Sequence, residues 1–145
     1  MIRIQSGPAA SVLAVANDGI AHARTVGLFL SANSRTISEQ LLQAATREGA
    51  AGMLIAIDGV AFAMPAMTRE HYAYVPPALR GIPVALIVNP EQAAFLASVQ
   101  GAAAQAGTVR RIFLSQEQAM LWLKEQTRAL AANRVWWSRQ RAVAP

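Results

Sequence analysis

The stretch Met53-Leu-Ile-Ala-Ile-Asp-Gly-Val-Ala-Phe-Ala-Met-Pro-Ala-Met67 decides the fold of this chain. It begins as a short apolar run, reaches an Asp-Gly step and then continues into a segment of Ala, Met and Pro. An apolar run of this length, bounded by turn residues, is typical of a strand buried on both faces of a sheet. We therefore predict an interior strand at residues 53–58, closed by Asp58, and a loop after it.

The composition indicates one globular domain. The chain has 145 residues, of which 54% are hydrophobic and 14% charged, so it can bury a core without metals or disulfides. It contains no cysteine, which excludes thiol catalysis, disulfides and thiolate metal sites. The sequence shows neither a signal-peptide pattern nor an apolar run of roughly 18 residues that could span a membrane. We expect a cytoplasmic protein without a transmembrane segment.

The remaining sequence predicts a mixed α/β sheet. Asp18-Gly19 lies between two apolar runs and predicts an antiparallel hairpin, and residues 2–5 predict an edge strand. A capping box at Thr36–Glu39 predicts the start of a helix. Further strands and helices are then predicted in alternation at residues 53–58, 68–79, 84–88, 90–107, 110–114 and 116–133. This order indicates a single domain in which the N-terminal hairpin is followed by parallel βαβ units with flanking helices.

The net charge of +5 is concentrated at the C-terminal end. Residues 128–145 contain four arginines and no acidic residue, so the body at residues 1–127 is almost neutral. We therefore expect no nucleic-acid partner for the body and separate it from a basic tail at residues 128–145. Trp136 and Trp137 within that tail suit a membrane interface, phosphate and base stacking, or a partner surface. The favoured interpretation is that they pack on the parent domain or on a second copy.

The sequence offers little catalytic chemistry. Phosphate-binding glycine patterns and metal-ligand spacings are absent, so we predict no catalytic residue, cofactor or metal. His22 is expected to be an ordinary strand residue. Asp58 is interpreted as a turn residue, although a carboxylate there could also lie over the sheet edge. His71 follows Glu70 directly, and neighbouring residues point roughly 100° apart on a helix, which favours a solvated helix face over proton transfer.

Three stretches, Met53–Phe62, Gly81–Val88 and Arg110–Leu123, resemble the STAS/SpoIIAA-like family of anti-sigma-factor antagonists. The last of them is most similar to the STAS/SEC14-like branch. The resemblance covers roughly residues 10–125 and implies a SpoIIAA-like fold. In the partner-switching members, a kinase phosphorylates a serine in the loop after the central strand. Alignment on Gly59-Val60 and Phe62 places Ala66 at that serine, and the nearest hydroxyl is that of Thr68.

The resemblance therefore implies a non-enzymatic regulatory or protein-interaction module that lacks the phosphorylatable serine. Its partner would be another protein or a second copy in a homodimer, bound through the loop at Gly59–Met67 and the helix that follows. The candidate contact residues are Asp58, Phe62, Met64, Met67, Thr68, His71 and Tyr72.

Two alternatives stay open. The STAS/SEC14-like branch implies a carrier or sensor of a small apolar ligand, held between the sheet and the helix that begins near Thr68. The least favoured alternative is a hydrolase-type enzyme that uses Asp58 with His71 or Glu70.

Overall fold

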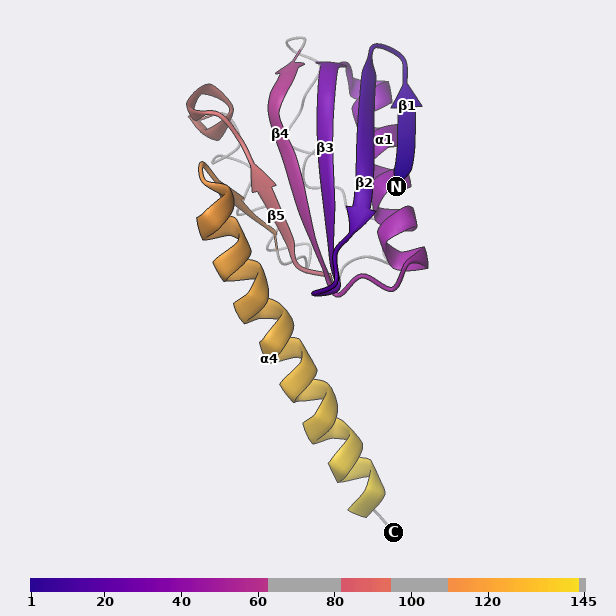
Figure 1. Cartoon of the computed structure of the whole chain (residues 1–145), viewed down its shortest axis with the longest axis vertical. Helices are drawn as coiled ribbons and strands as arrows, with labels where there is room; N and C mark the ends of the chain where they lie inside the picture. Colours follow the sequence, from indigo (N-terminus) through magenta and orange to yellow (C-terminus); the bar gives the residue numbers. More distant parts are fainter. Residues whose placement is uncertain (63–81, 95–109, 144–145) are drawn as a thin grey trace.

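The computed structural model describes residues 1–62, 82–94 and 110–143 and shows a six-stranded mixed sheet (Figure 1). The strands lie side by side in sequence order, from β1 at one edge to β6 at the other. They are β1 (Ile2–Ser6), β2 (Ala9–Val15), β3 (Ile20–Phe29), β4 (Gly52–Phe62), β5 (Val84–Ile87) and β6 (Arg110–Phe113). The labelled helices are α1 (Ser31–Arg47) and α4 (Gln116–Val143), and residues 90–94 begin a further helix.

The first three strands are antiparallel, which confirms the predicted hairpin and the edge strand before it. At the hairpin turn Gly19 has a φ of 82°, a left-handed value that favours glycine. The Asp18 carboxylate accepts a hydrogen bond from the backbone N–H of Ile20 at 3.0 Å. Asp-Gly therefore forms the turn through local interactions, and the Ala51 N–H adds a bond to the Gly19 oxygen at 2.9 Å.

Gly27 allows β3 to pass close to the turn between β1 and β2. Its φ is 109°, and a Cβ at this position would lie 2.2 Å from the backbone oxygen of Pro8. The next residue, Leu28, donates its N–H to that same oxygen at 3.0 Å. Only glycine meets both requirements, the left-handed backbone and the close approach.

Strands β3, β4, β5 and β6 are parallel, and β4 lies in the interior between β3 and β5. The side chains of residues 53–57 are all buried, as predicted for a strand covered on both faces. The predicted end at Asp58 is wrong, because β4 continues through Gly59 to Phe62. The Asp-Gly step is thus inside the strand, and residues 59–62 are not loop.

Helix α1 begins at Ser31, five residues before the predicted capping box at Thr36. The Asn33 side chain explains the early start. Its oxygen accepts the N–H of Leu30 at 2.6 Å, and its amide donates to the backbone oxygens of Leu28 and Ser6 at 2.9 and 3.2 Å. These bonds satisfy a helix-terminal donor and join the helix start to the sheet, which a local sequence pattern does not reveal.

The helices lie on opposite faces of the sheet. On one, the α1 face, Ile37, Leu41 and Leu42 pack on alternate residues of β1–β5, and Ala93 packs beside them. On the other, the α4 face, Ala119 and Leu123 are fully buried against β4 and β5. The rings of Phe113 and Trp122 lie 5.6 Å apart and extend this second cluster. Met120 also packs against this cluster.

Helix α4 covers β4–β6 and then leaves the sheet (Figure 1). It runs to Val143, ten residues past the predicted end at Asn133, so residues 128–143 are the second half of one continuous helix. No helix within the three described ranges is long and apolar enough to cross a membrane. The helix predicted at residues 90–107 is confirmed over residues 90–94. Its remainder and the helix predicted at residues 68–79 lie outside the described residues.

Candidate functional site

Asp58 lies at an irregularity in β4. Arg24 pairs with Ala56 and Val26 pairs with Gly59, so β4 has one more residue than β3 between these two pairs. The Asp58 carboxylate lies 3.4 Å from the Arg24 guanidinium, and the side chains are 41% and 61% exposed. An exposed ion pair at this distance contributes about 0–1 kcal/mol to stability. The expected turn role of Asp58 is wrong, since its side chain contacts a neighbouring strand.

Asn89 and Gln92 join the helix after β5 to the second half of β4. The Asn89 oxygen accepts the Gln92 N–H at 2.8 Å, and the Gln92 oxygen accepts the Asn89 N–H at 3.0 Å, which is a reciprocal helix cap. The Gln92 amide donates to the carbonyls of Ile57 and Val60 at 2.8 Å each. The Asn89 amide donates to the Asp58 carbonyl at 3.2 Å.

The Asn89 and Gln92 side chains supply hydrogen-bond donors that β5 does not supply to the second half of β4. Pairing of β4 with β5 ends at Ala56 and Ile87, so the β4 carbonyls beyond that point need other donors. Gln92 is only 4% exposed, and both its amide nitrogen and its oxygen are engaged. The polar groups of Asn89 and Gln92 thus hold β4 and the following helix together at this edge of the sheet.

The structure brings together few of the predicted contact residues. Asp58 is described above, and Phe62 is the last residue of β4. Met64, Met67, Thr68, His71 and Tyr72 lie outside the described residues, as do Glu70 and the predicted ligand pocket near Thr68. His22 is half-buried on β3, as expected for a strand histidine.

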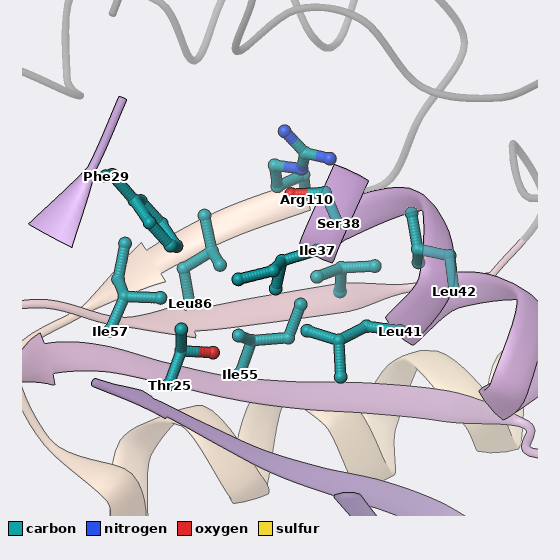
Figure 2. Close-up of a pocket in the computed structure, with 11 residues that line it drawn as sticks. Thr25, Phe29, Ile37, Ser38, Leu41, Leu42, Ile55, Ile57, Leu86 and Arg110 are labelled. Carbon is teal, nitrogen blue, oxygen red and sulfur yellow. The ribbon is translucent and has the colours of Figure 1, made fainter. Parts of the chain in front are cut away.

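A small apolar cavity lies on the α1 face between α1 and the sheet (Figure 2). Its volume is about 50 Å³. Its apolar lining comes from both layers and includes Phe29, Ile37, Leu41, Leu42, Ile55, Ile57 and Leu86. Figure 2 shows Arg110 and Ser38 together at one end of it. A water needs about 10–15 Å³ of such space and drug-sized ligands about 300–1,000 Å³, so this cavity accommodates only a very small molecule.

Within residues 1–62, 82–94 and 110–143, no helix covers the α4 face of β1–β3 except at Ile20, and we call the uncovered surface the open face. Strand alternation places nine residues of β1–β3 on it: Arg3, Gln5, Ala10, Val12, Ala14, His22, Arg24, Val26 and Leu28. The open face also includes Asp58 of β4, whose carboxylate pairs with Arg24. Val26 is 50% exposed. A hollow of about 350 Å³ runs from the side chains of Val12 and His22 to Gln116 at the start of α4. Of these two cavities, the hollow beside the open face is therefore larger than the cavity between α1 and the sheet.

The sequence reasoning missed the open face and the role of Gln92. The spacing Asn89-x-x-Gln92 is that of a capping box and could have indicated the reciprocal cap. The small apolar residues Ala10, Val12 and Ala14 alternate with buried positions and so mark a second apolar face of β2. Nothing in the local pattern shows that this face stays without a helix.

With this geometry established, comparison with known proteins adds no family. A scan against protein-family models and a search of curated proteins both find no match for this chain. Within the three described ranges, no group of three or more His, Asp or Glu residues is placed to hold a metal ion.

Proposed function

We propose that this chain is a non-enzymatic, STAS-like regulatory module of the cytoplasm that acts by binding a protein partner through its open face. The observation that carries the proposal is the uncovered half of the sheet on the α4 face. Apolar side chains such as Val12, Val26 and Leu28 line it next to a helix that already covers the other half. An apolar sheet face beside such a step is typical of an interaction surface.

Three further observations support the proposal. The described elements follow the order hairpin, helix, strands and final helix that the STAS-like resemblance implies. The carbonyl-rich end of β4 is occupied by Asn89 and Gln92. Asp58 is an exposed member of an ion pair, where its carboxylate meets solvent and Arg24. These roles are structural, and together they favour contact over chemistry.

Site-specific photocrosslinking in cells tests the proposal. A photoreactive phenylalanine analogue replaces Val26 on the open face, and a matched variant carries it at Val15, which is 37% exposed on the α1 face of the neighbouring strand. We expect a protein adduct from the Val26 position and none from Val15. Adducts from both positions in equal yield, or from neither, would contradict the proposal.

A second candidate function is a sensor of a small apolar ligand, favoured by the cavity beside α1. The cavity is apolar and bears Arg110 and Ser38 at one end, so a small apolar acid would match its lining. Native mass spectrometry of the purified protein tests this candidate. A bound mass that disappears in Leu41→Phe, which fills the cavity, would support it, and an apo mass for the wild type would exclude it.

A further inference from the structure

The partner that fits the open face can be inferred from the molecule itself. We infer that the occupant is a second copy of this chain, arranged so that each copy places the outer side of its α4 on the open face of the other. This inference rests on the proposed function, because it identifies the partner of the same surface. Four features of the described residues lead to it.

The first feature is a step in the molecular surface. Helix α4 forms a layer over β4–β6, while no helix in the described part of the chain covers β1–β3 on that same face. A helix with its side chains is about 10 Å across, so the missing layer has the thickness of one helix. A second copy turned about a two-fold axis would supply that helix, and its own missing layer would be filled by α4 of the first copy.

The second feature is an exposed apolar residue on the outer side of α4. Leu121 is 66% exposed, whereas Ala119 and Leu123 on the same helix are fully buried against the sheet. A large aliphatic side chain facing solvent is a weak signal alone. It becomes informative here because the same molecule exposes Val26, at 50%, on a face that lacks a helix.

The third feature is charge complementarity. The open face carries Arg3, Arg24 and Asp58 and has a net charge of +1. The start of α4 carries Glu117, Lys124 and Glu125, all exposed, and has a net charge of −1. Opposite charges on the two surfaces favour the open face against α4 of another copy over two open faces against each other.

The fourth feature is area. Three strands about 4.8 Å apart, each with about seven residues at about 3.3 Å, give an open face of roughly 300 Å². Specific interfaces bury about 1,200–2,000 Å² in total, so one open face against one helix, roughly 600 Å² in total, is too small. The reciprocal arrangement doubles this to roughly 1,200 Å², the lower end of that range, because each copy contributes both an open face and a helix.

The arginine-rich second half of α4 is less suited to self-association than the first half. Residues 128–143 contain four arginines and no acid, so two such segments would repel each other. The inferred contact therefore uses the first half of α4, from Glu117 to Glu125, and leaves the basic half outside it.

Sedimentation equilibrium of the purified full chain at about 1–100 μM tests the inference. We expect twice the monomer mass of 15.4 kDa for the wild type. Val26→Glu and Leu121→Glu should each raise the dimer Kd at least 30-fold. Val15→Glu makes the same kind of change on the α1 face and should alter the Kd less than threefold. Circular dichroism and thermal unfolding of all three variants verify that they are folded.

The outcomes separate the inference from the proposal on which it rests. A wild type that stays monomeric at 100 μM overturns the inference that the partner is a second copy. A Val26 photoadduct with a different protein would in that case still support the proposed interaction module. A dimer that Val26→Glu leaves intact assigns self-association to another surface and also overturns the inference. No photoadduct at Val26 together with a monomer would overturn both.

Discussion

At the residue scale, the Gln92 side chain joins β4 to the helix that follows β5. Its single amide group donates to two carbonyls of β4 that lie beyond the end of β5, and its oxygen caps the following helix. A buried acceptor without a donor costs about 1–3 kcal/mol. Gln92 thus holds one side of the second half of β4, while β3 pairs with the other side.

Substitution Gln92→Met tests that role. Methionine matches the length of the side chain but cannot donate, so the carbonyls of Ile57 and Val60 lose their partner. We expect the free energy of unfolding in urea to fall by about 2–4 kcal/mol. Glu91→Gln, at the exposed neighbouring position, is the control and should stay within about 0.5 kcal/mol. Equal stability of Gln92→Met and wild type would contradict the role.

Asp58 should matter much less for stability. Asp58→Ala breaks an exposed ion pair with Arg24, so we expect a loss of no more than about 1 kcal/mol, which shrinks further at high salt. Glu39→Ala breaks the similarly exposed Arg35–Glu39 pair and serves as the matched comparison. Urea unfolding at two salt concentrations measures both. A loss above about 2 kcal/mol for Asp58→Ala would indicate a role that the ion pair does not explain.

At the scale of elements, local signals predicted the elements that local interactions form. Asp18-Gly19 makes its turn through its own side chain and backbone, and the hairpin was predicted correctly. The strand at residues 53–57 is buried on both faces and was recognised as an apolar run. In both cases the residues that decide the structure are close neighbours in the sequence.

The errors arise where the deciding contact is distant. Strand β4 continues past Asp58 because β3 pairs with residues 59–62 on one side and Gln92 supplies donors on the other, both from more than thirty residues away. Helix α1 starts before Thr36 because Asn33 bonds the oxygen of Ser6. The extent of α4 is different, since residues 116–143 contain no Gly or Pro and no helix-ending signal lies at Asn133.

Substitutions of two glycines test whether β3 must pass close to the turn between β1 and β2. Gly27 and Gly19 both have left-handed backbones, but only Gly27 lies against other atoms. Gly19→Ala should therefore cost about 1–2 kcal/mol, the conformational penalty alone. Gly27→Ala adds a clash with the Pro8 oxygen and should cost at least about 3 kcal/mol or prevent folding. Thermal unfolding compares them, and similar losses would show that β3 does not need this close approach.

At the scale of the whole molecule, the described helices cover the two faces of the sheet unequally. Helix α1 packs on a large core that extends over β1–β5, whereas α4 covers β4–β6 on the opposite face. Where α4 lies decides which half of the sheet stays open, and no local pattern contains that information. The open face was for this reason beyond prediction from the sequence, although its apolar residues were visible there.

Truncation separates the two halves of α4. The helix packs on the sheet through residues 119–127, and its C-terminal half extends beyond the sheet (Figure 1). Deletion of residues 132–145 should therefore change the free energy of unfolding by less than about 1 kcal/mol and leave the dimer intact. Leu123→Ala, which opens the core under the first half, should cost about 2–5 kcal/mol. A dimer lost on truncation would place the contact in the basic half instead.

Cysteine crosslinking measures whether the open face of one copy meets α4 of another. The chain has no cysteine, so a Val26→Cys copy mixed with a Leu121→Cys copy has one thiol on each. After treatment with a short bismaleimide, we expect a mixed crosslinked dimer by mass spectrometry, and none when Val15→Cys replaces Val26→Cys. Equal crosslinking from Val15 and Val26, or none from either, would contradict this contact.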